Sequence, residues 1–164
     1  MKAMSASRIS SSTFPTKAVA IINNTVPRSG NTPPVLKFDA GGPAGAGPLG
    51  LTTGPLSTKV DQPIELTVWA HDDGRNDPSV GRTGRRDVPV TLTWFKYQGP
   101  GDVTLSEESA EVPVSGGEMT TTATFDRPGE YILRVRANDA SGVSGAGHAQ
   151  CCWTNGFVNV TVTQ

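Results

Sequence analysis

Three segments near the C-terminus decide the fold of this chain: Met119-Thr-Thr-Thr-Ala-Thr-Phe125, Glu130-Tyr-Ile-Leu-Arg-Val-Arg-Ala-Asn138 and Phe157-Val-Asn-Val-Thr-Val-Thr163. Each is rich in β-branched or aromatic residues and alternates in polarity, which is typical of a strand with one buried face. No part of the sequence shows a convincing 3.6-residue period, which a helix would require. The sequence therefore predicts an all-β protein.

The first two of these segments are joined by Asp126-Arg-Pro-Gly129, a turn sequence in which Gly129 can supply a positive φ. We expect residues 119–125 and 130–138 to pair as a hairpin. In the second segment the inward positions are predicted to be Tyr131, Leu133, Val135 and Ala137, and the outward positions Ile132, Arg134 and Arg136.

Further strands are predicted upstream, at residues 35–38, 64–70, 88–97 and 103–105. In residues 64–70, Ile64, Leu66, Val68 and Ala70 share one face, because successive side chains of a strand point to opposite sides. With an isolated strand at 17–23, the total is seven to eight. This number and the turn spacing predict an antiparallel β-sandwich.

A length of 164 residues indicates one domain with an appended arm. We assign residues 34–164 to the sandwich, with a loop insertion at 140–156. Residues 1–33 are rich in Ser, Thr and Pro and form either a disordered leader or an N-terminal arm. In the second case the segment around Ile21 and Ile22 is expected to pair with a sheet edge, in its own subunit or in a neighbour.

Residues 93–105 and 121–139 resemble PKD-type and receptor-for-egg-jelly-type immunoglobulin-like repeats. In those repeats a Trp on a central strand precedes a Gly-Pro-Gly turn, as Trp94 does here, and a Phe…Pro-Gly-x-Tyr segment leads into Asn-Asp. The resemblance implies an immunoglobulin-like sandwich at the cell surface or outside the cell, where such repeats serve adhesion, spacing or glycan contact. This chain lacks the Trp-x-Phe-Gly-Asp-Gly signature and carries the insertion at 140–156.

The insertion contains the only two cysteines of the sequence, Cys151 and Cys152, which are adjacent. They are either joined in a vicinal disulfide, whose eight-membered ring requires a distorted peptide, or reduced and packed as small apolar side chains. Beside a ring, Trp153 would offer a flat apolar surface for a sugar, with Gln150 and Asn155 as polar partners.

Acidic side chains gather at two predicted strand ends. Asp72, Asp73 and Asp77 share one loop, and Asp139 follows another strand. Loops at one end of a sandwich can converge, and carboxylate oxygens are the ligands that calcium prefers. These residues are therefore candidate calcium ligands, with ordinary solvated turns as the alternative.

Trp69 falls on the polar face of its predicted strand. If that strand shares a sheet with residues 130–138, the indole would stack on Arg134 or Arg136. Otherwise it would lie under the N-terminal arm or a partner subunit. An aromatic side chain on a polar face is in either case a candidate interface residue.

No catalytic motif stands out, so we predict a non-enzymatic module. With the location and role that the resemblance implies, it would be a structural or adhesive module outside the cell or in the cell envelope. It would bind other proteins, or itself as a homo-oligomer or fibre, through sheet faces, sheet edges and the arm. A net charge of −1 and the lack of Lys/Arg clusters interleaved with aromatics argue against nucleic acid, and no segment approaches the ~20 apolar residues of a membrane span. The alternative is a carbohydrate-binding module that uses Trp153 and the Cys151–Cys152 loop.

Overall fold

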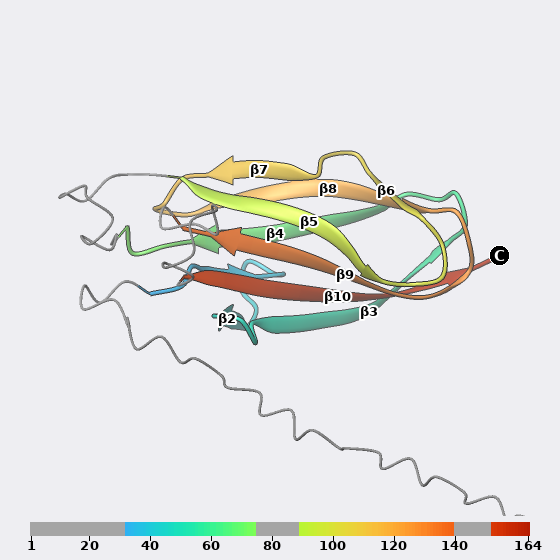
Figure 1. Ribbon diagram of the computed structural model, residues 1–164, viewed down its shortest axis with the longest axis horizontal. Coiled ribbons are helices and arrows are strands. Elements are labelled where there is room, and N and C mark those ends of the chain that lie inside the picture. The colour runs from blue at the N-terminus through green and yellow to red at the C-terminus, as the bar shows by residue number, and fades with distance from the viewer. Residues whose placement is uncertain (1–31, 75–88, 140–151) are drawn as a thin grey trace, which may run out of the picture.

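The computed structural model describes residues 32–74, 89–139 and 152–164, and in these ranges the fold is a two-layer β-sandwich (Figure 1). One layer, the β4 sheet, has the order β2 (Ala44–Ala46), β1 (Val35–Lys37), β4 (Ile64–His71), β8 (Gly117–Phe125) and β6 (Val103–Leu105). The other, the β9 sheet, has the order β3 (Leu51–Lys59), β10 (Trp153–Thr163), β9 (Gly129–Asn138), β5 (Val90–Gln98) and β7 (Ser109–Val112). The predicted all-β fold is confirmed.

The core lies between the two sheets and follows the alternation expected from the sequence. All four predicted inward residues of β9 are buried, and so are the three valines at the end of β10. The buried apolar side chains come from both layers: Leu36, Leu66, Val68, Ala70, Val90, Leu92, Trp94, Val112, Met119, Ala123, Phe125, Tyr131, Leu133, Val135, Ala137, Val158, Val160 and Val162. Burial of this set removes apolar surface from water, which is the main favourable term in folding.

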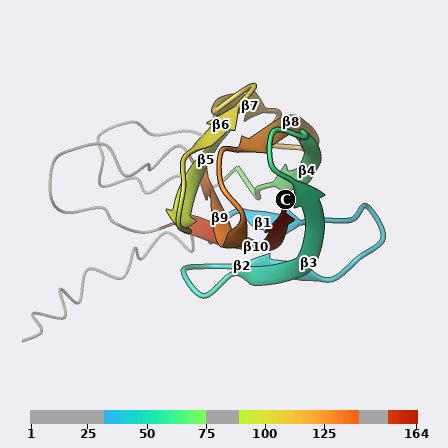
Figure 2. The same ribbon diagram turned by 90° about the vertical axis from the view of Figure 1, so that its right-hand side faces the viewer.

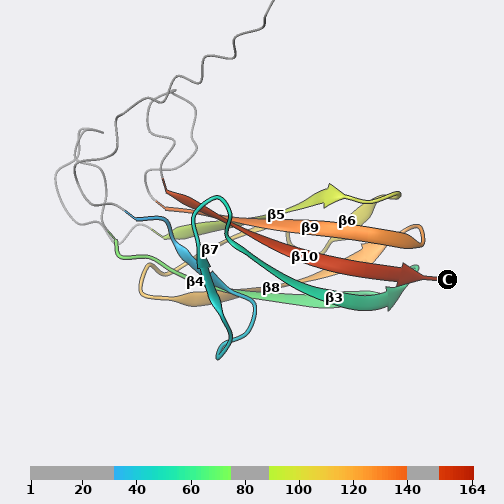
Figure 3. The same ribbon diagram turned by 90° about the horizontal axis from the view of Figure 1, so that it is seen from below.

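The first edge of the sandwich changes sheets, which gives the fold its immunoglobulin-like character. β1 pairs antiparallel with β4 in one layer, and β2 pairs with the other edge of β1. The chain then crosses to the second layer, where β3 pairs with β10. The β3–β10 pairing is parallel, so the sandwich is not wholly antiparallel as predicted. The end-on view shows the two layers facing each other, and the view from below shows β3 beside β10 (Figures 2 and 3).

The predicted hairpin between residues 119–125 and 130–138 is wrong, because β8 and β9 lie in different sheets. The turn at residues 126–128 is an arch across the core, and Gly129 adopts a φ of 143°. Phe125 and Tyr131 pack edge to face across it, with ring centroids 4.7 Å apart. Turn chemistry alone does not tell a hairpin from an arch, since both require a tight reversal of the chain.

Tyr131 fixes this arch through its hydroxyl group. The hydroxyl donates to the carbonyl of Arg127 at 2.8 Å and accepts from the backbone N–H of Gly101 at 3.1 Å. The side chain is only 1% exposed. A tyrosine that bonds back to the chain just upstream is a hallmark of immunoglobulin-like domains, called the tyrosine corner.

Three strands were not predicted: β2, β3 and β7. β3 has no clean alternation, and its pairing with β10 is irregular between Val158 and Val160. β7 is four residues long and lies at an edge of its sheet. β10 begins at Trp153, so the last four residues of the predicted insertion belong to a strand. Short edge strands carry weak patterns because they are only half covered.

The isolated strand predicted at 17–23, with Ile21 and Ile22, lies outside the described residues. Within the described ranges we find no helix of the length and apolarity needed to cross a membrane.

Candidate interaction surfaces

The outer surface of the β9 sheet brings aromatic and arginine side chains together from three strands. We call Phe95, Tyr97, Arg134, Arg136 and Phe157 the arginine–aromatic face. Phe95 of β5 and Phe157 of β10 both stand opposite Arg134 of β9 in the strand register. Because residues opposite each other in a sheet project to the same side, these side chains form one row across the outer surface.

The two guanidinium groups stack on the aromatic rings of this face. The Cζ atom of Arg134 lies 4.9 Å from the centroid of Phe95 and 5.7 Å from that of Tyr97, and Cζ of Arg136 lies 5.3 Å from Phe95. Tyr97 also meets Phe157 edge to face at 5.5 Å. These distances lie within the range of cation–π attraction, so the rings hold both arginines against the sheet.

The charges of these arginines have no counter-ion among the described residues. Neither guanidinium forms an ion pair there, and the Nε atoms of both are buried without a hydrogen-bond partner. By register, Glu130 of β9 and Glu111 of β7 project to the same side of the sheet as the two arginines. Glu130 accepts a hydrogen bond from Thr161 at 2.9 Å, and Glu111 is separated from β9 by the intervening strand β5. The face is therefore locally cationic.

Two residues of the predicted glycan site, Trp153 and Asn155, project from β10 on this same outer surface and are half-buried. Asn155 stands opposite Arg136 in the register. Its Nδ2 atom donates to the carbonyl of Pro48 at 2.8 Å, and its Oδ1 atom is buried without a partner. The third residue, Gln150, lies outside the described residues.

Cys152 directly precedes β10 and is buried, with 4% exposed, and its φ of 88° is unusual for a residue with a side chain. No free cysteine is found in the described part of the chain. The neighbour Cys151 lies outside it, so the vicinal disulfide stays a prediction.

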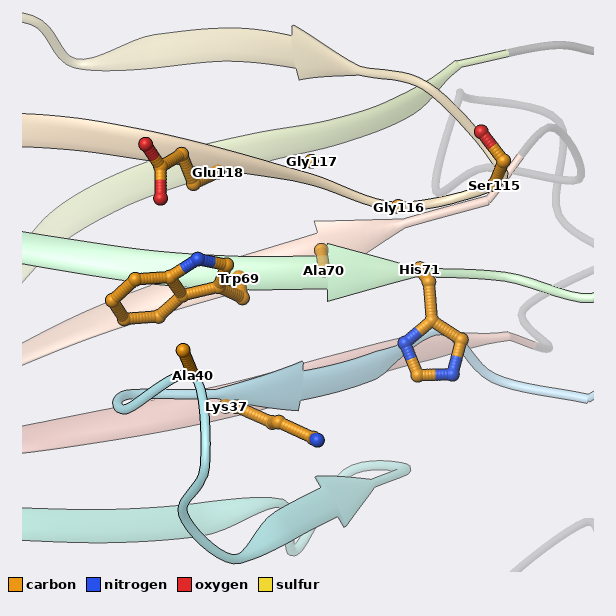
Figure 4. Close-up of a pocket in the computed structure, with 9 residues that line it drawn as sticks. All are labelled: Lys37, Ala40, Trp69, Ala70, His71, Ser115, Gly116, Gly117 and Glu118. Atoms are coloured by element: carbon orange, nitrogen blue, oxygen red, sulfur yellow. The ribbon is translucent and has the colours of Figure 1, made fainter.

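Trp69 lies on the opposite outer surface, that of the β4 sheet. The predicted stacking on Arg134 or Arg136 is wrong because β4 and β9 belong to different sheets. The indole instead lies in the row between Lys37 of β1 and Glu118 of β8 (Figure 4). The outward direction of Trp69 was correctly predicted, and of the alternatives for its neighbours the arginines are excluded.

An open groove of ≈ 650 Å³ runs over this part of the β4 sheet. We call it the Trp69 groove; its lining is Lys37, Ala40, Trp69, Ala70, His71, Ser115, Gly116, Gly117 and Glu118. Lys37 and Glu118 carry opposite charges on its two sides (Figure 4). The groove is thus a second surface on which a partner could rest, but without an excess of either charge.

The acidic loop begins where β4 ends. Burial raises the pKa of Asp72 above its ordinary value, and the nearby charges of Asp139 and Asp73 raise it further, against hydrogen bonding that lowers it. One of these bonds comes from the N–H of Gly74, which donates to Oδ2 at 2.9 Å. The carboxylates are therefore close enough to repel one another.

In the described part of the chain, no group of three or more His, Cys, Asp or Glu residues is arranged to hold a metal ion. Asp77, the fourth candidate ligand, lies outside it. Calcium binding by Asp72, Asp73 and Asp139 therefore stays a prediction.

Sequence reasoning missed Phe95, Tyr97 and Phe157 as members of one surface. The outward direction of Arg134 and Arg136 was predicted from alternation and is confirmed. A search for basic residues interleaved with aromatics along the chain cannot find this face, because the sheet assembles it from strands about 40 and 20 residues apart. To predict this face from the sequence, the order of the strands in the sheet would have to be known.

Comparisons with known proteins give matches among solved structures. No protein-family model matches the chain, and neither does any curated protein. Among solved structures, domains 4 and 5 of the S-layer protein SbsC are similar, with 16% identity over 68% of this chain and 49% of that one and a TM-score of 0.37.

The D0-D1 domain of Intimin shows 25% identity over 68% of this chain and 47% of that one, with a TM-score of 0.38. The ASH/PapD-like domain of human CEP192 shows 11% identity over 82% of this chain and 87% of that one, with a TM-score of 0.43. The chain spans about half the length of the first two structures. All three scores are below 0.5, so the immunoglobulin-like fold is established here by the sheet topology itself.

Proposed function

We propose that this protein is a non-catalytic structural or adhesive module that binds other proteins, or copies of itself, through the outer surface of the β9 sheet. The observation that carries the proposal is the arginine–aromatic face. Protein interfaces are enriched in Tyr, Phe, Trp and Arg relative to the rest of the surface, and their binding energy is concentrated in such residues. Tyr97 is 57% exposed at the margin of this face and is available to a partner.

Self-association is the first form of this proposal to test. Sedimentation velocity over a wide concentration range, with electron microscopy of the concentrated sample, should show an oligomer or a fibre. Tyr97→Asp places a charge on the arginine–aromatic face and should shift the sample towards monomer. Thr67→Asp, a matched change on the outer surface of the β4 sheet, should leave the assembly intact. A chain that is monomeric at every concentration rules out self-association.

The N-terminal arm is the second element of the proposal. We expect residues 17–23 to add as a strand to an exposed sheet edge, where main-chain hydrogen bonds supply affinity. Deletion of residues 1–30 should then lower either the assembly state or the thermal stability. If both are unchanged, the arm makes no such contact.

A location at the cell surface or outside the cell belongs to the same proposal, as does a relationship to PKD-type repeats. Both rest on the resemblance of residues 93–105 and 121–139 to those repeats. A disulfide between Cys151 and Cys152 would accord with an oxidising compartment. The intact mass under non-reducing conditions would be lower by about two hydrogens if the bridge is present.

Carbohydrate binding is the alternative function. It is supported by the position of Trp153 and Asn155 on the outer surface of the β9 sheet, beside the unpartnered Oδ1 atom of Asn155. A glycan array with Trp153→Ala as control tests it. Binding that disappears in the variant would favour this function, and no binding above background would exclude it for the glycans on the array.

A further inference from the structure

From the unpaired guanidinium groups of the arginine–aromatic face, we infer that its ligand is an extended acidic polypeptide segment whose carboxylates are two residues apart. The inference rests on the proposed function, since it names the chemistry of the partner at the same surface. Arg134 and Arg136 are the residues that would hold the carboxylates.

The spacing of the two arginines supports an extended partner. Arg134 and Arg136 are two residues apart on β9 and project to the same side. A strand rises about 3.3 Å per residue, so their attachment points are roughly 6.6 Å apart. Carboxylates at every second position of an extended chain have the same spacing, which allows one partner strand to meet both arginines.

The orientation of the guanidinium groups supports a carboxylate. Stacking on Phe95 at 4.9 and 5.3 Å restrains both groups before a ligand arrives. A restrained planar guanidinium loses little conformational freedom when it forms two parallel hydrogen bonds with a carboxylate. Tyr97 and Phe157, in contact with each other at the side of Arg134, would cover the apolar part of the same segment.

The distribution of charge favours a short acidic segment over a long polyanion. The first 34 residues carry four of the 14 Lys and Arg and none of the 15 Asp and Glu, so residues 35–164 have a formal net charge of −5. A domain of this charge repels a long polyanion outside the local cationic face. The N-terminal arm is excluded as the ligand, because it has no carboxylate side chain to offer.

Two synthetic peptides of equal composition and charge test the inference: four alternating Thr-Glu pairs, and a block peptide, Glu-Glu-Thr-Thr repeated twice, in which no two carboxylates are two residues apart. Titration of the full-length isotope-labelled protein, followed by NMR, should show shifts on β5, β9 and β10. The alternating peptide should bind several-fold more tightly than the block peptide. The double variant Arg134→Gln with Arg136→Gln should bind the alternating peptide about tenfold or more weakly, as expected for loss of charge-assisted hydrogen bonds.

Arg127→Gln is the matched control, since Arg127 is 68% exposed, lies in the turn between β8 and β9, and has Asp126 3.8 Å away. It should leave the affinity unchanged. The double variant Arg134→Lys with Arg136→Lys keeps both positive charges and serves as a second test in case the Gln variant does not fold. Its affinity for the alternating peptide should be several-fold lower than that of the native protein, because an ammonium group cannot form the bidentate contact.

Three outcomes would overturn the inference: neither peptide binds, both bind equally, or polygalacturonate or a single-stranded oligonucleotide binds this face while the alternating peptide does not. Sedimentation measurements of self-association are independent of these titrations. The inference can therefore fail while self-association through this surface stands.

Discussion

The two outer surfaces of this sandwich obey the same alternation but differ in how their polar groups are paired. On the β4 sheet, the hydroxyl groups of Thr67 and Thr120 bond to each other at 3.0 Å, and charges of opposite sign lie on either side of Trp69. On the β9 sheet, Arg134 and Arg136 stack on rings without a counter-ion among the described residues. A surface that satisfies its own polar groups gains little from a partner, whereas unpaired charges gain from one.

The largest expected effect comes from removing the scaffold that holds both surfaces. Tyr131→Ala should destabilise the protein by about 3–5 kcal/mol, because it leaves a cavity and removes two hydrogen bonds at the arch. Tyr131→Phe should cost about 1–3 kcal/mol, through the unsatisfied backbone groups alone. Chemical denaturation followed by circular dichroism measures both. Tyr97→Phe, at an exposed position, should change stability by less than about 0.5 kcal/mol; an equal loss at the two tyrosines would contradict the role of the arch.

A smaller effect is expected within the arginine–aromatic face. Phe95→Leu removes the ring on which both guanidinium groups stack and should cost about 1–2 kcal/mol. A double-mutant cycle with Arg134→Gln should give a coupling of about 0.5–1 kcal/mol. Additive effects would show that the stacking does not stabilise the folded state, and that the arginines are held in place by other contacts.

The acidic loop near the β4 sheet should give a smaller, pH-dependent effect. The pKa of Asp72 is raised in the folded state, so folding favours its protonated form, and stability falls as the pH rises from 3.8 through the folded-state pKa. Asp72→Asn should therefore raise the melting temperature at pH 7 and have little effect near pH 3. Thermal melts at both pH values, in the presence of a chelator, measure this. A lower melting temperature of the variant at pH 7 would contradict it.

The smallest effect on stability is expected on the outer surface of the β4 sheet, where the polar groups bond to one another. Thr67→Val replaces one hydroxyl of an exposed pair by a methyl group of similar shape. Its effect on stability should be within about 0.5 kcal/mol, and the peptide titrations should be unchanged. A variant that weakened peptide binding as much as Arg134→Gln would remove the distinction between the two surfaces.

The sequence was sufficient for the directions of side chains along each long strand. Tyr131, Leu133, Val135 and Ala137 were predicted to be inward and are buried, and Arg134 and Arg136 were predicted to be outward and are half-buried. Alternation is a local property, because it follows from the period of two in a single strand. It needs no knowledge of neighbouring strands.

The pairing of strands is harder to predict from the sequence, because the same turn residues occur in a hairpin within one sheet and in an arch between two sheets. Residues 126–129 were therefore assigned to the wrong kind of connection, and the sequence could not decide between the alternatives for the neighbours of Trp69. The Tyr131 hydroxyl distinguishes the two cases only once its bonds to Arg127 and Gly101 are seen. β3 was missed because an edge strand with an irregular register lacks the alternation of a central one.

Radical footprinting of the protein with and without the alternating Thr-Glu peptide reports on both outer surfaces in one sample. The account predicts that Tyr97 and Phe157 are protected from oxidation by the peptide, while Trp69 reacts at the same rate in both states. Protection of Trp69 with unchanged oxidation of Tyr97 and Phe157 would place the ligand on the β4 sheet and contradict the central claim.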